Sequence, residues 1–106
     1  MTIFKVATAA QWREAEAAGV FTGAPVDIAD GFIHFSTSAQ VAETLTRHFA
    51  GQRDLLLVAV DDAMLGAALR WEPSRGGQLF PHLYAPLPLA TVISVRPIPD
   101  DHVLAL

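Results

Sequence analysis

The chain contains no cysteine among its 106 residues. This excludes a disulfide framework, a thiolate nucleophile and a zinc–thiolate site. Long apolar runs are also missing, since the longest, Leu55–Val60, is far shorter than the ~20 residues that cross a bilayer. The first residues, Met1–Lys5, do not show the charged and then apolar pattern of a signal peptide. We therefore expect a cytoplasmic protein without a membrane partner.

Positive charge is scarce as well. Seven Lys and Arg residues face eleven Asp and Glu residues, which gives a net charge of −4. Such a balance offers no general attraction to phosphate backbones, so a nucleic-acid partner is not expected. Hydrophobic residues make up 52% of the chain, which indicates either a well-filled core or an exposed apolar patch that forms a homodimer. The length predicts a single domain over residues 1–106.

Strand-like segments outnumber helical ones and do not alternate regularly with them. This order predicts an α+β fold with a mainly antiparallel sheet of about five or six strands and two helices. Residues Thr22–Asp30 are expected to form a loop, and Pro81 confines its strand to an edge or a bend. The expected helices are Ala9–Ala18, after a capping box of Thr8 and Gln11, and the segment from Thr37 or Ser38 to Gly51. The expected strands are Ile3–Ala7, Gly31–Ser36, Asp54–Val60, Ala68–Glu72, Leu79–Ala85 and Thr91–Arg96.

Polar side chains interrupt the strand expected before the second helix. Alternation along an extended chain places His34 and Ser36 on one face, roughly 7 Å apart at ~3.3 Å per residue. We interpret both as pocket residues, and we add Thr37 and Gln40, which follow directly, as ligand-binding candidates. The alternative for His34 is a half-buried side chain bonded to a backbone carbonyl, and the alternative for Gln40 is a solvated helix face.

A second polar segment runs from Glu72 to Gly77. A carboxylate at a strand end suits a sugar hydroxyl, and Arg75 in the following loop suits a phosphate. The backbone amides of Gly76 and Gly77 add donors for an anion. The alternative is a surface salt bridge between Glu72 and Arg75, worth about 0–1 kcal/mol.

The third segment places His82 and Tyr84 on one face of an extended chain. Two hydrogen-bonding rings held side by side suit a planar or hydroxylated ligand, although an ordinary edge strand has the same pattern. Histidine titrates near neutral pH, so Glu72 and His82 form the candidate acid–base pair, with His34 as a further catalytic candidate. None of the four histidines has metal-ligand spacing, so no metal is expected.

These motifs together resemble a bacterial family known as domain of unknown function 952. The resemblance spans nearly the whole chain and implies the α+β fold of ADP-ribosyltransferases. In that fold group an early-strand His or Arg binds the ribose of NAD, a Tyr stacks on nicotinamide, and a late-strand Glu stabilises the transition state. His34 is similar to the first of these, whereas the late-strand Glu is missing and Glu72 would have to replace it. The resemblance rests on Gly31–Thr37, Gln40, His48–Phe49, Asp54–Leu55, Trp71–Glu72, Ser74–Gly77 and Phe80–Tyr84.

We conclude from the sequence that the chain forms a pocket for a small-molecule ligand of the nucleotide class, with NAD as the candidate cofactor. His34 and Ser36 would hold ribose hydroxyls, Arg75 would hold phosphate, and Tyr84 would stack on a base. The expected chemistry is ADP-ribosyl transfer or glycosidic hydrolysis. Two alternatives remain open: a non-catalytic binding or interaction module, and a binder of a small sugar or carboxylic acid.

Overall fold

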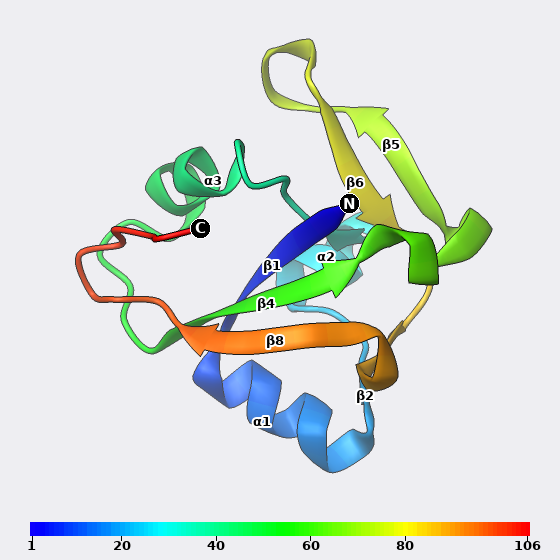
Figure 1. The fold of residues 1–106 in the computed structure, drawn as a ribbon, viewed down its shortest axis with the longest axis horizontal. Coiled ribbons are helices and arrows are strands. Elements are labelled where there is room, and N and C mark those ends of the chain that lie inside the picture. The colour runs from blue at the N-terminus through cyan, green and yellow to red at the C-terminus, as the bar shows by residue number, and fades with distance from the viewer.

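The chain folds around three small antiparallel sheets (Figure 1). A computed structural model describes residues 1–106, the side chain of Arg75 excepted. Within these residues the sheets have the strand orders β1-β4-β8, β2-β7 and β3-β6-β5. The helices are α1 (Ala9–Ala18), α2 (Pro25–Asp30) and α3 (Val41–His48). The strands are β1 (Thr2–Thr8), β2 (Val20–Phe21), β3 (Ile33–His34), β4 (Leu55–Asp61), β5 (Leu69–Pro73), β6 (Leu79–Leu83), β7 (Leu87–Pro88) and β8 (Val92–Pro97).

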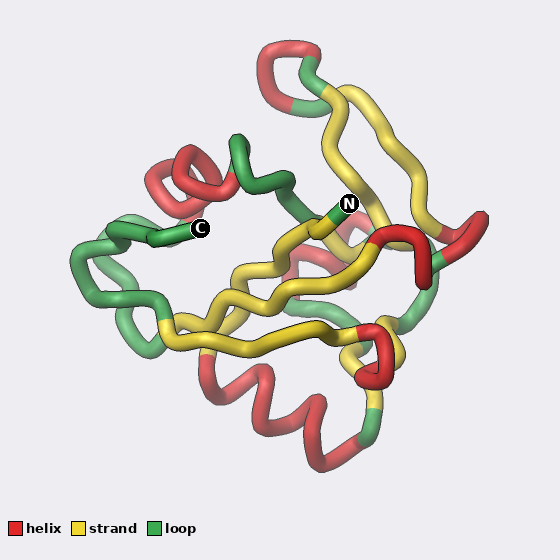
Figure 2. Tube along the Cα trace, viewed as in Figure 1, coloured by secondary structure: helices red, strands yellow, loops and turns green.

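The sheet β1-β4-β8 carries a hydrophobic core on each face. Trp12 of α1 belongs to one core, together with Ile3 and Val58. Leu45 of α3 belongs to the other, together with Phe4. Figure 2 shows the two helices on opposite sides of this sheet. Because both faces are covered, β1 and β4 are almost continuously apolar, and a charged residue inside either strand needs a special partner.

The first sheet is joined at one point to the segment that follows β3. Phe4 and Ser36 form an isolated antiparallel bridge, with each backbone N–H donating to the other's carbonyl oxygen at 2.8 Å. The third sheet continues from there through β6 to β5, and the hairpin of β5 and β6 extends away from the rest of the chain (Figure 2). The segment that carries His34 and Ser36 therefore lies beside β1, with His82 of β6 opposite His34.

The α+β class, the antiparallel pairing and the first helix are confirmed. The expectation of one sheet with about five or six strands was wrong, because the described residues form eight strands in three separate sheets. Gln11 N–H donates to Thr8 Oγ1 and Thr8 N–H donates to Gln11 Oε1, so the capping box is present. The number of helices was wrong, because α2 lies inside the expected loop at Thr22–Asp30. Pro25 occupies its first turn, where a missing N–H costs nothing. A single turn and a half is too short to show helical periodicity.

The second predicted helix begins later and ends earlier than expected. Residues Thr37–Gln40 form a turn in which Thr37 N–H donates to Gln40 Oε1 at 3.0 Å. The helix proper, α3, starts at Val41 and ends at His48, before Gly51. Thr37 and Gln40 therefore form a turn that precedes α3, and they do not form a capping box in its first turn.

Pro81 was expected to confine its strand to an edge or a bend, and the edge position was wrong, since β6 is the central strand of its sheet. The neighbouring strand β3 spans only Ile33 and His34, which pair with Leu83 and His82. Phe35 N–H donates to the Pro81 carbonyl at 3.0 Å just beyond that strand. Proline has no N–H to donate, but at Pro81 the regular hydrogen-bond ladder between β3 and β6 has already ended, so no ladder bond is lost there.

The described residues contain no helix that is both long and apolar enough to cross a membrane. This finding does not test whether the protein has a membrane partner, so the expectation that it has none stays a prediction.

Candidate functional site

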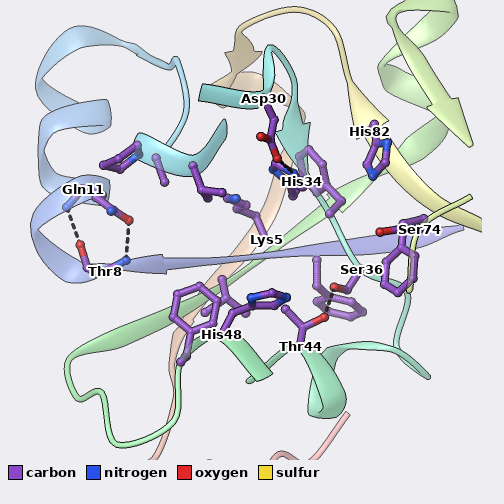
Figure 3. Close-up of a pocket in the computed structure, with 18 of the residues that line it drawn as sticks. Lys5, Thr8, Gln11, Asp30, His34, Ser36, Thr44, His48, Ser74 and His82 are labelled. Atoms are coloured by element: carbon purple, nitrogen blue, oxygen red, sulfur yellow. Dashed lines mark hydrogen bonds and ion pairs between the residues drawn. The ribbon is translucent and has the colours of Figure 1, made fainter. Parts of the chain in front are cut away.

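A cavity of about 550 Å³ lies along β1, where that strand parts from β3. Thr8 and Gln11 line one end, Ser74 and His82 line the other, and Lys5 lies between them (Figure 3). The remaining walls come from β1, from α2 and the residue before it, from β3 and α3 with the segments that follow them, and from β6. They include Phe4, Val6, Ala24, Pro25, Val26, Asp30, His34, Phe35, Ser36, Thr44, His48, Phe49, Gln52 and Phe80. The volume is in the range of small-molecule sites.

A buried ion pair forms the floor of this region. Lys5 is 4% exposed and Asp27 is 2% exposed, and Lys5 Nζ lies 2.9 Å from both Asp27 carboxylate oxygens. Burial lowers the pKa of the Lys5 ammonium, and the charge of Asp27 partly offsets this effect. Ala24 N–H also donates to Asp27 Oδ2 at 2.7 Å. The Asp27 carboxylate therefore accepts hydrogen bonds from β1 and from the residue before α2.

Asp27 also holds His34. The backbone N–H of His34 donates to Asp27 Oδ1 at 3.1 Å, and its ring Nδ1 lies 2.7 Å from the same oxygen. Burial by itself raises the pKa of Asp27, but the bond from His34 and the charge of Lys5 outweigh burial and hold that pKa at about 2. On the other side of the ring, Nε2 lies 2.9 Å from Asp30 Oδ2. We call Lys5, Asp27, Asp30 and His34 the Asp27 cluster.

A second carboxylate supports the second histidine. His82 Nδ1 lies 2.9 Å from Glu72 Oε1, and Tyr84 O–H donates to the same oxygen at 2.7 Å. The bond from His82, and then the bond from Tyr84, lowers the pKa of Glu72. The bond to Glu72 in turn raises the pKa of Tyr84. We call Glu72, His82 and Tyr84 the Glu72 cluster.

One aromatic ring joins the two clusters. The Phe32 ring lies 4.1 Å from the His82 ring in a stacked arrangement, and 4.5 Å from the His34 ring. The two imidazole rings are 5.6 Å apart, centre to centre, and meet edge to face. Phe32 also lies 5.2 Å from the Tyr84 ring. This packing restricts both histidines to one orientation at one end of the cavity.

The structure brings four of the predicted site residues together at the cavity: His34, Ser36, Glu72 and His82. His34, His82 and Ser36 line the cavity, and Ser36 Oγ lies 2.9 Å from Thr44 Oγ1. Glu72 contacts the cavity through His82. Tyr84 was predicted to stack on a base, but it is not one of the described residues that line the cavity. Its ring instead packs on Phe32 and lies 4.7 Å from the Arg70 guanidinium carbon.

The remaining predicted residues lie away from the histidines. Gln40 donates from Nε2 to the Leu79 carbonyl at 2.9 Å, so with Thr37 it ties the turn before α3 to β6. Gly76 and Gly77 are in the turn between β5 and β6, with φ values of 63° and 77° that glycine adopts readily. The side chain of Arg75, predicted to hold phosphate, lies outside the described residues. Each of these ligand-binding assignments stays a prediction.

The sequence reasoning missed Lys5, Asp27 and Asp30. One signal was available, because Lys5 is the only charged residue in the strand predicted at Ile3–Ala7, and a buried charge requires a partner of opposite sign. Asp27 and Asp30 gave no comparable signal, since they fell in a segment expected to be a loop. Within the described residues, no group of three or more His, Asp or Glu side chains is arranged to hold a metal ion.

Comparisons with known proteins agree with the resemblance found in the sequence. Residues 6–95 match a family described as a protein of unknown function, DUF952. The crystal structure of protein CC0527 from Caulobacter crescentus is 46% identical, with a TM-score of 0.90 over 92% of this chain and 85% of that chain. The solution NMR structure of the same bacterial protein is also 46% identical, with a TM-score of 0.82 over 92% and 84% of the two chains. No match was found among curated proteins.

Neither matched structure is described as an ADP-ribosyltransferase or by any activity. The likeness to that wider fold group, which the sequence resemblance implied, is not shown by these comparisons.

Proposed function

Because the chain belongs to the family described as a protein of unknown function, DUF952, which assigns no reaction, we propose a function from the site itself. The cavity binds a nucleotide or NAD-like ligand, and its two histidines break a glycosidic bond of that ligand by acid–base catalysis. One observation carries this proposal: each histidine is bound through Nδ1 to a carboxylate, and the two rings meet at 5.6 Å at one end of the cavity.

The orientation of the rings supports a division of roles. Glu72 Oε1 accepts two hydrogen bonds, one of them from His82 Nδ1, which leaves His82 Nε2 as an acceptor. A base in that position takes a proton from water or from an acceptor hydroxyl, whose oxygen then bonds to the anomeric carbon. As the glycosidic bond breaks, the leaving group takes the bonding electrons. A leaving group that would otherwise depart as an anion also takes a proton from His34 Nε2, whereas nicotinamide departs neutral and needs none. The ionised Glu72 carboxylate stabilises the positive charge that develops on the sugar ring.

The rest of the lining fits the other parts of such a ligand. The hydroxyls of Ser36 and Thr44 lie beside each other in the wall, in keeping with the expected contact between Ser36 and ribose hydroxyls. The apolar side chains of Val26 and Phe49 also line the cavity. Apolar walls of this kind suit a flat aromatic ring. Cleavage by water makes the protein a glycosidic hydrolase, and cleavage by an acceptor makes it a transferase of the ADP-ribosyl type.

Thermal-shift measurements with NAD, ADP-ribose, AMP, adenosine and ribose test the binding step. A ligand at 100 times its Kd stabilises the folded state by about 2.7 kcal/mol, which raises the melting temperature by several degrees. Chromatography of the incubated ligand then tests the cleavage step. We expect His34→Gln and His82→Gln to lose cleavage by at least ~100-fold, the usual contribution of a general acid or base.

A matched control is available in the C-terminal segment. His102 lies in the left-handed region with φ of 60°, which asparagine also adopts, so His102→Asn removes an imidazole without backbone strain. This variant should cleave like the wild type. The proposal is wrong if no nucleotide or sugar stabilises the protein, or if His34→Gln and His82→Gln cleave as fast as His102→Asn.

A further inference from the structure

His34 lies between two aspartates, and the two ring nitrogens face different oxygens. Nδ1 lies 2.7 Å from Asp27 Oδ1, and Nε2 lies 2.9 Å from Asp30 Oδ2. A neutral imidazole has only one N–H, so it can donate to only one of two carboxylates. The two contacts therefore determine how many hydrogen atoms the His34 ring and its two aspartates share.

The first hydrogen belongs to Nδ1. Asp27 is buried and ionised, and it already accepts hydrogen bonds from Lys5, from Ala24 and from the backbone of His34. An ionised carboxylate has no hydrogen to give. The contact at 2.7 Å consequently needs the hydrogen on His34 Nδ1, and the lone pair of a neutral ring would point from Nε2 toward Asp30.

A second hydrogen must lie between Nε2 and Asp30. Without it, a ring lone pair and a carboxylate lone pair would face each other at 2.9 Å and repel. The pair of His34 and Asp30 thus carries one hydrogen more than a neutral ring facing a carboxylate. That hydrogen points along the edge of the ring that lines the cavity.

Asp30 itself is placed where an exchange is easy. It is the last residue of α2, where the helix carbonyls disfavour a negative charge. Its side chain is 49% exposed, and its carboxylate lies 2.9 Å from His34 Nε2. The Asp27 carboxylate on the other side of the ring is 1% exposed and fixed by four bonds. One aspartate is therefore fixed and the other can move away.

We propose that Asp30 occupies the place of an anionic oxygen of the ligand, and that a phosphate or carboxylate oxygen replaces it on His34 Nε2 when the ligand binds. This inference rests on the proposed function: the anionic oxygen belongs to the leaving group, so the group that accepts the bond from Nε2 in the complex is also the group that takes its proton when the glycosidic bond breaks. A phosphate monoester and a free carboxylate share the chemistry required here, an oxygen that carries negative charge and accepts the bond from Nε2.

The charges around the site are consistent with such an exchange. Lys5 and Asp27 neutralise each other beneath the ring, and His82 faces Glu72 on β5. His48 of α3 lines the opposite wall. When a ligand anion replaces the Asp30 carboxylate, one negative charge leaves Nε2 as another arrives, so the net charge in contact with His34 is unchanged. The anionic oxygen therefore meets a donor that is already in place.

The experiment follows the ring nitrogens of His34 in the full-length protein by ¹⁵N NMR at pH 6. The probes are inorganic phosphate, acetate, AMP and adenosine. In the free wild type we expect both nitrogens of His34 to give protonated signals. In Asp30→Asn the amide donates to Nε2 in place of the carboxylate, so His34 should become the neutral tautomer with its hydrogen on Nδ1.

Affinity gives a second readout. Removing the internal anion with Asp30→Ala should tighten the binding of the anionic probes by at least fivefold, while adenosine, which lacks the anion, should change less than twofold. Asp100→Ala is the matched control, since Asp100 is an exposed aspartate that lies 3.8 Å from Arg53. A gain with phosphate and AMP only identifies a phosphate group, and a gain with acetate only identifies a carboxylate.

Two results would overturn the inference: a single protonated nitrogen on His34 in the free wild type, or unchanged or weaker anion binding by Asp30→Ala. Circular dichroism melting of the variants shows whether they are folded, and Asp30→Asn provides the NMR test if Asp30→Ala is not. The two proposals can fail separately. If anions displace Asp30 but no ligand is cleaved, only the proposed reaction fails. If nucleotides are cleaved but the ¹⁵N signals of His34 are the same in wild type and Asp30→Asn, only this inference fails.

Discussion

The two histidines of the site are supported in opposite ways. In the Asp27 cluster the carboxylate is buried, at 1% side-chain exposure, and His34 is one-third exposed. In the Glu72 cluster His82 is buried, at 7%, and the carboxylate is one-third exposed. The Asp27 cluster also includes a buried lysine, whereas Glu72 shares its oxygen with the half-exposed Tyr84. The more deeply the carboxylate is buried, the more the free energy of unfolding should fall when its cluster is broken.

The largest difference between the clusters should appear in stability. Asp27→Asn leaves the Lys5 ammonium buried without an opposite charge, which costs about 3–5 kcal/mol of the free energy of unfolding. Urea denaturation measures this loss. The double variant Lys5→Met with Asp27→Asn removes the charge as well and should recover most of it. The comparison fails if Glu72→Gln is as destabilising as Asp27→Asn, or if the double variant is no more stable than the single one.

A smaller effect should appear at acid pH. The pKa of Asp27 is about 2 in the folded protein, against an ordinary value of 3.8 for aspartate, so the folded state binds the Asp27 proton more weakly than the unfolded state does. The stability from this group is complete above pH ~4 and is lost as the pH falls toward 2, about 2 kcal/mol in all.

Urea denaturation at a series of pH values tests this prediction. Other carboxylates also titrate in that range, so the double variant Lys5→Met with Asp27→Asn supplies the baseline. The wild type should lose about 2 kcal/mol more than the double variant between pH 4 and pH 2. Parallel curves for the two proteins would contradict the assignment.

The smallest effect concerns the Glu72 cluster and is spectroscopic. The chain has one tyrosine, Tyr84, so ultraviolet titration of tyrosinate reports on that residue alone. Because the bond to the Glu72 carboxylate raises the pKa of Tyr84, Glu72→Gln should move the titration to lower pH. Glu16→Gln, an exposed change on α1, should leave it in place. A titration that is identical in wild type and Glu72→Gln would show that the bond is absent in solution.

The sequence predicted the regular parts of the fold because their signals are local. The first helix is specified by its own capping residues, and the long strand β4 by its own apolar run. The short helix α2 was missed because six residues do not show a period. The central position of β6 was missed because Pro81 is tolerated only through the early end of β3, a fact about a different segment.

The site divides in the same manner. His34, Ser36, Glu72 and His82 could be found because polar residues stand out within apolar strands. Asp27 and Asp30 could not, since their roles depend on the contacts that α2 makes with β1 and β3. Lys5 stood out equally within its strand, but only the structure shows which acid it meets.

The Lys5–Asp27 ion pair also fixes the register of β1 against β4 and against Ser36. Side chains in a strand alternate between faces, so a slip of one residue would move Lys5 from its contact with Asp27 to the opposite core beside Leu45 and Leu57. Aliphatic side chains on both faces of β1 would tolerate such a slip, and a lysine would not. The ion pair therefore selects one register for the strand, and with it the position of the Phe4–Ser36 bridge from which the cavity opens.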